Sequence, residues 1–382
     1  MKHWNDILAS SNGAIIEWAA SRPWAEAMRH CLQDAVWHAE GDVWTHTLLV
    51  CAEVEKLPEY RDLPRSSQIA LLFTALLHDA GKPATTTIEP ETGRTRSPRH
   101  SIVGESLARG ILRELQCPLE ERERIAHLVR YHGRPVFLLD KEAPEAEVIR
   151  HSWLVPNDLL HLFTLADYRG RDTAENTREE SMLYFWKDLA KELGCYADPY
   201  PFVNDQARFL FYRDSLSDLF FVPHEHHRSS VIQMSGIPGT GKDTWLERHH
   251  PGLPVVSLDN IRRRMGIEPT DNQGHVIQAA REECRVHLRA GRDFAFNATN
   301  VTASLRRKWI DLFHDYEARI HITYLEPPLP TILRQNQDRE HAVPERVIRH
   351  LLEKTDIPTV AEAHSVTWLT GAESGQLCWQ SP

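Results

Sequence analysis

A glycine-rich segment between an apolar run at 231–235 and a helical pattern leaves few folds open to this chain. Its sequence is Gly236-Ile237-Pro238-Gly239-Thr240-Gly241-Lys242-Asp243-Thr244. Glycines let backbone N–H groups curl around an anion, a helix N-terminus adds a favourable dipole, and a lysine adds a positive charge. The order strand, loop, helix argues against a chance glycine-rich turn. The segment predicts a loop that binds the phosphates of a nucleoside triphosphate, ATP or GTP, with Mg²⁺.

One position of this loop departs from the usual pattern. The residue after the lysine is normally Ser or Thr, whose hydroxyl holds magnesium, and here it is Asp243. A carboxylate can also bind magnesium, but it adds negative charge beside the triphosphate. Thr244 follows and could share the role, so the sequence leaves the magnesium contact open between these residues.

The hydrophobic pattern changes near residue 225. Before it, the chain predicts helices at 66–77, 101–115, 120–131 and 179–193. After it, short apolar runs alternate with helical patterns; the runs lie at 231–235, 254–258, 293–297, 319–325 and 365–369, and the helical patterns at 275–290, 303–316 and 344–354. Strands that alternate with helices predict βαβ units and a parallel sheet. We therefore predict an all-α domain over 1–225 and an α/β domain with a helical lid over 226–382.

Composition supports a folded protein with an uneven charge. The net charge is −10, and residues 226–382 hold 19 basic and 19 acidic residues, so the excess of acid lies in the first domain. The chain has no run of 18 apolar residues, no secretory signal at its start, and no CxxC pair among its six cysteines. We expect a reduced, cytoplasmic protein without a membrane segment.

Polar residues follow the second and third predicted strands. Asp259 ends the strand 254–258, and Arg262 shares its helix face three positions on. At the edge of a parallel sheet beside a phosphate loop, such a carboxylate can activate an acceptor hydroxyl. Asn297-Ala298-Thr299-Asn300 ends the third strand, and we assign Asn300 and Arg306 to substrate binding. Arg334 lies in a segment that could close over the γ-phosphate, although a solvated helix face explains it equally well.

Residues 231–370 resemble the P-loop polynucleotide kinases, which phosphorylate 5′-hydroxyl ends. The shared features are the phosphate loop, Asp-x-x-Arg after the second strand, x-Ala-Thr-Asn after the third, and a lid of the form Asn-x-x-Arg followed by Val-Pro. The resemblance implies that Asp259 is the general base, that Arg262 contacts the acceptor phosphate, and that Arg339 contacts the donor phosphates. Relatives commonly begin the third-strand motif with Asp, where this chain has Asn297.

The first domain contains metal-binding side-chain types at helix ends. Leu76-Leu77-His78-Asp79-Ala80-Gly81-Lys82-Pro83 ends a strongly apolar helix, where unpaired polar groups would be costly. Further candidates are His46 at the start of a helix over 47–54, His100 in a loop over 83–104, His132, and Asp167. Each has a structural explanation alone, as a cap or a core histidine. Together they form a set suited to a divalent transition metal.

This set resembles the HD phosphohydrolase superfamily over about 35–215, and most closely the HD module of bacterial CCA-adding enzymes. The resemblance implies that one metal is held by His46, His78, Asp79 and Asp167. His100 and His132 are implied for a second ion, with His127 as a competitor to His132. Lys82 and Arg94 are implied to bind the substrate phosphate.

The combination resembles the HD–polynucleotide kinase family of bacterial end-healing enzymes. This implies that the first domain clears a 2′,3′-cyclic phosphate or a 2′/3′-phosphate, and that the second phosphorylates a 5′-hydroxyl of RNA or DNA before a polynucleotide ligase acts. One alternative joins a small-metabolite or nucleoside kinase to an HD nucleotide phosphohydrolase. Another is a nucleotide sensor with degenerate catalysis, which Asp243 favours and the intact Lys242 and Asp259 oppose.

Overall fold

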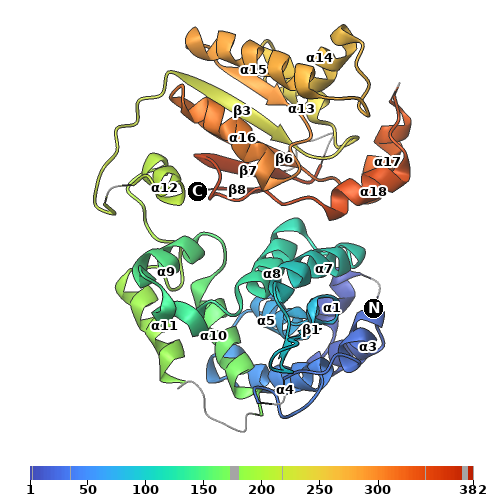
Figure 1. Cartoon of the computed structure of the whole chain (residues 1–382), viewed down its shortest axis with the longest axis vertical. Coiled ribbons are helices and arrows are strands. Elements are labelled where there is room, and N and C mark those ends of the chain that lie inside the picture. The colour runs from blue at the N-terminus through green and yellow to red at the C-terminus, as the bar shows by residue number, and fades with distance from the viewer. Residues whose placement is uncertain are drawn as a thin grey trace. The chain divides into compact units, whose positions relative to one another are not determined.

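The computed structural model describes residues 1, 3–34, 36–172, 180–216, 218–339, 341–371 and 377–381. It divides into two compact units, Met1–Pro201 and Phe202–Pro382, seen as a helical body and an α/β body in Figure 1. The division lies before the predicted boundary at 225, because helix α12 (Asp205–Tyr212) packs with the second unit. The Arg208 guanidinium donates to the carbonyl of His364, and Phe209 stacks on the His364 ring.

The first unit is a bundle around one buried helix. Helix α5 (Arg65–Leu77) has no exposed surface from Ile69 to Leu77, which is the property expected of a helix that is apolar on all sides. It packs against α4 (Val43–Lys56), α8 (Leu119–Tyr131) and α10 (Asn157–Arg169). The remaining helices are α1 (Trp4–Ala9), α2 (Asn12–Ala20), α3 (Pro23–Arg29), η1 (Pro58–Asp62), α6 (Lys82–Thr85), α7 (His100–Glu114), η2 (Pro135–Asp140), α9 (Pro144–Ser152) and α11 (Ser181–Glu192).

The segment predicted as one long loop, 83–104, is more ordered than its lack of periodicity suggested. It contains the end of α6, a short antiparallel pair of strands, β1 (Thr87–Ile88) and β2 (Thr95–Arg96), and the start of α7. Strands of two residues are too short to show an alternating pattern, so the sequence did not reveal them.

Within the described residues the second unit holds a six-stranded sheet in the order β4-β5-β3-β6-β7-β8. The strands are β3 (Ser229–Ser235), β4 (Val255–Ser257), β5 (Phe294–Asn297), β6 (Ala318–Leu325), β7 (Ser365–Leu369) and β8 (Leu377–Gln380). The first five pair in parallel, as predicted, and β8 adds an unpredicted antiparallel edge. The helices are α13 (Lys242–His249), α14 (Leu258–Met265), α15 (Gly274–Arg289), α16 (Ala303–His314), α17 (Leu329–Gln337) and α18 (Glu345–Glu353).

This topology places the candidate functional residues of the second unit at one edge of the sheet. Strand β3 lies between β5 and β6, and the glycine-rich loop follows it directly. Asp259 follows β4, and Asn297 ends β5. The carboxyl ends of parallel strands meet at one edge of a sheet, where open α/β sheets bind ligands. Among the residues described, no helix combines the length and apolar character needed to cross a membrane.

Candidate active sites

The glycine-rich loop folds into a cradle suited to phosphate. It also contacts α17, the helix in which the predicted lid segment begins. Gly239 has a φ of 84°, and a Cβ there would lie 2.7 Å from the carbonyl oxygen of Ile332 in α17. Only glycine permits both this backbone conformation and this close approach. Lys242 begins α13 and donates to the carbonyls of Gly236 (2.8 Å) and Ile237 (3.1 Å). Burial lowers the pKa of Lys242 to about 8, against the opposing effect of nearby carboxylates.

A pocket of about 310 Å³ lies over this cradle. Asp259 and Arg339 both line it, and the Arg339 guanidinium lies 3.9 Å from the Asp259 carboxylate. Arg262 donates to the Asp259 carboxylate and, through Nε, to Gln273 (2.6 Å). The structure therefore brings the predicted base, the predicted lid arginine and the phosphate loop to one cavity.

The two parts of the predicted lid motif, Asn336-x-x-Arg339 and Val343-Pro344, are joined by hydrogen bonds. Asn336 donates to the carbonyl of Val343 (2.8 Å) and accepts from its N–H (3.0 Å), which closes the chain between them into a loop. Arg339 projects from this loop into the pocket. Gln335, Asp338 and Arg248 also line the pocket and were not predicted, because nothing in their local pattern distinguishes them from solvated helix residues.

The two departures from the usual pattern contact each other. Asn297 Nδ2 donates a hydrogen bond of 2.6 Å to Asp243 Oδ1, and both residues line the pocket. Thr244 lines it as well. No local pattern could pair Asp243 with Asn297, since 54 residues separate them.

Three predicted residues lie elsewhere. Asn300 is buried and donates to the carbonyl of Met234 (2.8 Å). Arg306 is fully buried, pairs with Glu362 at 2.7 Å, and also donates to two backbone carbonyls. Both side chains are bonded within the protein, which favours a role in holding the fold over the predicted contact with an acceptor. Arg334 is exposed on α17 and is not among the residues that line the pocket.

In the first unit, the predicted metal ligands converge from five helices or helix ends. They are His46, His78, Asp79, His100, His132 and Asp167. His46 Nε2 lies 3.0 Å from Asp167 Oδ1, and His78 Nε2 lies 3.8 Å from the same oxygen. These three side chains are buried and form one group whose ligand atoms lie within 4.8 Å of one another.

A second group adjoins the first through one carboxylate. Asp79, His100 and His132 also have ligand atoms within 4.8 Å of one another. Asp79 Oδ1 lies 3.5 Å from His100, whereas Oδ2 lies 3.2 Å from His78 and 3.9 Å from His46. The two oxygens of Asp79 therefore face different groups, which suits a bridging ligand. His127 is bonded instead to the carbonyl of Leu154 (2.7 Å), outside the cluster.

The histidines are oriented for ligation. Nδ1 of His78, His100 and His132 each lies 2.8–2.9 Å from a backbone carbonyl, which requires the proton on Nδ1 and leaves Nε2 with its lone pair. His46 Nδ1 faces Glu40 Oε1 at 2.9 Å. His78 Nε2 is buried and makes no hydrogen bond, although Asp79 Oδ2 lies 3.2 Å away. A buried, lone-pair nitrogen in this setting fits a metal ligand.

The electrostatics keep Asp79, Asp167 and His132 in their metal-binding forms, whereas for His46 burial is outweighed by Asp167 and Glu40, which raise its pKa. Burial alone would raise the pKa of Asp79, but His78 and Lys82 hold it well below its usual range. Arg171 and His46 do the same for the pKa of Asp167. Burial, with the neighbouring histidines, lowers the pKa of His132 to about 3. The carboxylates are therefore ionised and His132 is neutral at physiological pH.

Two cations lie directly on these carboxylates. Lys82 Nζ is 2.7 Å from Asp79, and Arg171 Nη2 is 2.6 Å from Asp167. Lys82 was predicted here, and Arg171 was missed, although its spacing of four from Asp167 on a helical pattern is a usable signal. The predicted Arg94 pairs with Asp34 at 3.3 Å and lies outside the residues that line the neighbouring cavity.

A close backbone contact brings the two ligand groups together. A Cβ on Gly81 would lie 2.1 Å from the carbonyl oxygen of His100. Any larger residue would push α7 away from the end of α5, and His100 away from Asp79. This explains the glycine in the His-Asp-x-Gly-Lys stretch in physical terms.

Comparison with known proteins identifies both units at the level of the domain. Residues 43–155 match the HD domain family, and residues 231–358 match the AAA domain family. The chain therefore joins an HD domain to a P-loop kinase-like domain, and the predicted fold class is confirmed.

Curated relatives share parts of the chain. A CC-adding tRNA nucleotidyltransferase of Thermus thermophilus is 32% identical over 158 residues, which are 41% of this chain and 33% of that protein. An L-seryl-tRNA(Sec) kinase of Methanococcus maripaludis is 24% identical over 140 residues, 34% of this chain and 53% of the kinase. This chain thus spans about a third to a half of these relatives. A gluconokinase structure from Sinorhizobium meliloti overlaps with a TM-score of 0.30 at 15% identity, covering 39% of this chain and 87% of that one, too distant to carry an argument.

Proposed function

We propose that the chain is a bifunctional nucleic-acid end-healing enzyme of the HD–polynucleotide kinase type. The P-loop unit transfers the γ-phosphate of an NTP to a 5′-hydroxyl end. The HD unit removes a 2′,3′-cyclic phosphate or a 2′/3′-phosphate. The observation that carries the proposal is the presence of two chemically complete sites, a phosphate loop with a carboxylate in one pocket and a buried histidine–aspartate cluster. By name, the two curated relatives act on tRNA, which favours nucleic acid over a free metabolite.

In the kinase site each residue has a distinct task. The loop amides and Lys242 bind the donor phosphates. Asp259 accepts the proton of the attacking hydroxyl, and Arg262, beside it, holds the acceptor phosphate. Arg339 neutralises charge on the transferred group.

Asp243 and Asn297 would hold the Mg²⁺ of the nucleotide, with the acidic and the neutral side chain in exchanged positions. P-loop NTPases hold the ion with a Ser or Thr after the loop lysine and with an acidic residue at a strand end. Here the carboxylate is on the helix side, as Asp243, and the neutral side chain ends the strand, as Asn297. The exchange keeps one negative charge at the site.

In the HD site the six predicted ligands would hold one or two divalent transition metals. Such an ion supplies Lewis-acid charge and an activated water. Asp79 connects the two groups, and the backbone-bonded Nδ1 atoms fix the rings of His78, His100 and His132.

The salt dependence of phosphorylation tests the substrate class. We expect the KM for a 5′-hydroxyl oligonucleotide to rise steeply between 50 and 200 mM salt, because several phosphates are neutralised on binding. Phosphorylation of a free nucleoside more efficient than that of any oligonucleotide, without salt dependence, would instead support a metabolite kinase. Metal analysis tests the other site: the wild type should hold up to two ions, and the His100→Ala/His132→Ala protein one at most.

A further inference from the structure

A cavity of about 710 Å³ opens beside the histidine–aspartate cluster. His100, Lys82 and Arg171 line it, and each of them contacts one of the two aspartates of the cluster. The cavity therefore adjoins the predicted metal ligands of the HD site. Its volume is within the range of small-molecule sites and far exceeds that of a phosphate ion.

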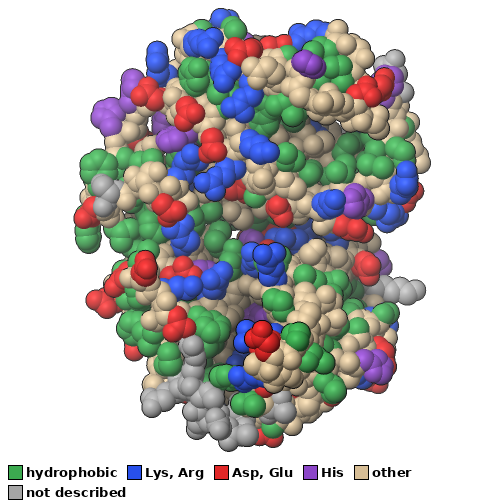
Figure 2. Space-filling view, in the orientation of Figure 1, with side chains coloured by type: hydrophobic (Ala, Val, Ile, Leu, Met, Phe, Trp, Pro, Cys, Tyr) green, Lys and Arg blue, Asp and Glu red, His purple; other side chains and the backbone are tan. Residues whose placement is uncertain are grey.

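The lining of the cavity contains more cations than acids, although each of the cations Lys82, Arg169 and Arg171 pairs with a carboxylate. The first 225 residues carry the whole net charge of −10. Among the described residues that line the cavity, however, Lys82, Arg169 and Arg171 are basic and Asp34 is the one acid. On the face shown in Figure 2, basic and acidic side chains are interspersed on the first unit, without a broad basic surface. The cavity therefore brings cations together in a way that the face shown in Figure 2 does not.

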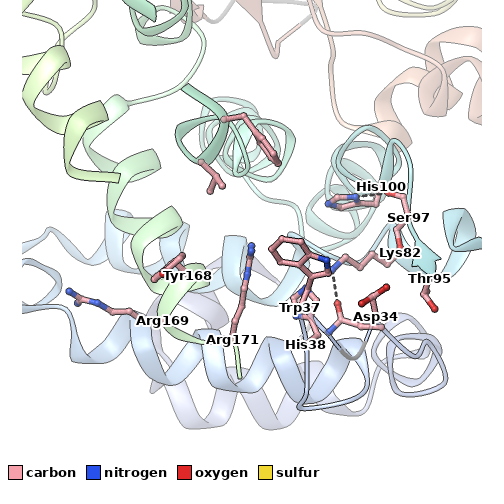
Figure 3. Close-up of a pocket in the computed structure, with 13 residues that line it drawn as sticks. Asp34, Trp37, His38, Lys82, Thr95, Ser97, His100, Tyr168, Arg169 and Arg171 are labelled. Carbon is pink, nitrogen blue, oxygen red and sulfur yellow. Dashed lines mark hydrogen bonds between the residues drawn. The ribbon is translucent and has the colours of Figure 1, made fainter. Parts of the chain in front are cut away.

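Part of the remaining wall is aromatic. Trp37, Phe137 and Tyr168 line the cavity, and Trp37 and Phe137 are 37% and 49% exposed. In the view of Figure 3, the indole of Trp37 lies between the side chains of Arg171 and Lys82, and the ring of His100 is drawn above it. Large aromatic side chains that remain this exposed beside cations offer a stacking surface for a flat ring.

Resting on the proposed function, we propose that this cavity binds the terminal nucleotide of the 3′ end, with its base against Trp37 and its phosphate over Lys82 and Arg171. A phosphate placed there lies against Asp79 and Asp167, the carboxylates that the two cations contact. Every base presents a π face, so stacking accepts all four bases. The cavity therefore selects a nucleotide over a small phosphomonoester without selecting its sequence.

The test compares two oligonucleotides that carry a 3′-phosphate and differ only in the base of the last residue, normal or abasic. A 5′ label removes the hydroxyl that the kinase site would use. For the wild type we expect kcat/KM to be about 10-fold or more higher with the base than without it. We expect less than a 3-fold difference among A, C, G and U at that position, by the same principle. In anisotropy titrations, the metal-depleted protein should bind the oligonucleotide with the terminal base more tightly than the abasic one.

Variants locate the effect. In Trp37→Ala the ratio of kcat/KM between the normal and the abasic oligonucleotide should fall toward one. Trp37→Phe should restore much of this ratio. Phe185 is similarly exposed, at 39%, but is not among the residues that line the cavity, so Phe185→Ala should keep the wild-type ratio. Equal kcat/KM for the two substrates in the wild type, which needs no variant, would overturn the inference, as would an unchanged ratio in Trp37→Ala. Hydrolysis of neither substrate would instead count against the proposed phosphoesterase.

Discussion

Asn297 donates a 2.6 Å hydrogen bond to Asp243, joining the last residue of β5 to the first turn of α13. The sequence presents these residues as two separate departures from the pattern of P-loop kinases. The structure shows that they are one feature, because they are hydrogen-bonded to each other in the wall of the pocket beside the glycine-rich loop.

The exchanged pair predicts compensation between the two positions. Asp243→Ser should lower kcat/KM for 5′ phosphorylation about 10-fold or more, because the site loses its carboxylate. Asn297→Asp should also lower it, because two carboxylates would meet beside the triphosphate. The double variant should recover most of the activity and the Mg²⁺ dependence of the wild type. Losses that simply add in free energy would show that the two residues act independently.

The general base is predicted to be Asp259. Asp259→Asn should lower the rate of 5′ phosphorylation about 10²–10⁴-fold, the usual contribution of a positioned base. Lys242→Ala should abolish the same reaction, because the donor phosphates lose their charged partner. Steady-state assays with Lys308→Ala as a surface control test both. Near-normal transfer by Asp259→Asn would remove it from the role of base.

Arg306 is predicted to act on stability and not on substrate binding. Its guanidinium is fully buried and paired with Glu362, and breaking a buried pair of this kind costs about 3–5 kcal/mol. Urea unfolding of Arg306→Ala should show a loss of that order, whereas the exposed neighbour in Arg307→Ala should show almost none. An unaltered unfolding free energy together with a raised KM for the acceptor would restore the prediction made from sequence.

Glu40 is predicted to position His46. The Glu40 carboxylate lies 2.8 Å from His38 Nδ1 and 2.9 Å from His46 Nδ1, so it directs His46 Nε2 toward Asp167. Glu40→Ala should weaken metal binding about 10–100-fold, measured by competition with a chelator. Glu40→Gln should retain part of the affinity, since its amide oxygen can still accept. Glu53→Ala, a half-buried change on α4, the helix that carries His46, is the control. Equal affinities in all four proteins would exclude the positioning role.

Sequence reasoning succeeded where local pattern carries the information. The glycine-rich loop, the parallel strands and the His78-Asp79 stretch have spacings that few other structures produce, so their places in the fold were predictable. Arg306 and Asn300 were assigned to the substrate because their positions after a strand suggested it, but burial depends on residues such as Glu362 that lie far along the chain.

The missed features differ in cause. Arg171 and Glu40 lie four and six residues from the ligands that they contact, whereas Trp37 lines the cavity only because segments far along the chain close around it. Helix α12 illustrates this at the level of domains, since its contact with His364 lies 156 residues away along the chain. No local pattern contains that information.

The most direct test of the account uses one RNA with a 5′-hydroxyl and a 2′,3′-cyclic phosphate, incubated with NTP, Mg²⁺ and a transition metal. Both ends are then analysed for the wild type, Lys242→Ala and Asp79→Ala. The wild type should phosphorylate the 5′ end and open or remove the 3′ phosphate; Lys242→Ala should lose the first reaction alone, and Asp79→Ala the second alone. If the wild type leaves both ends unchanged while it phosphorylates a free nucleoside, the end-healing function is wrong.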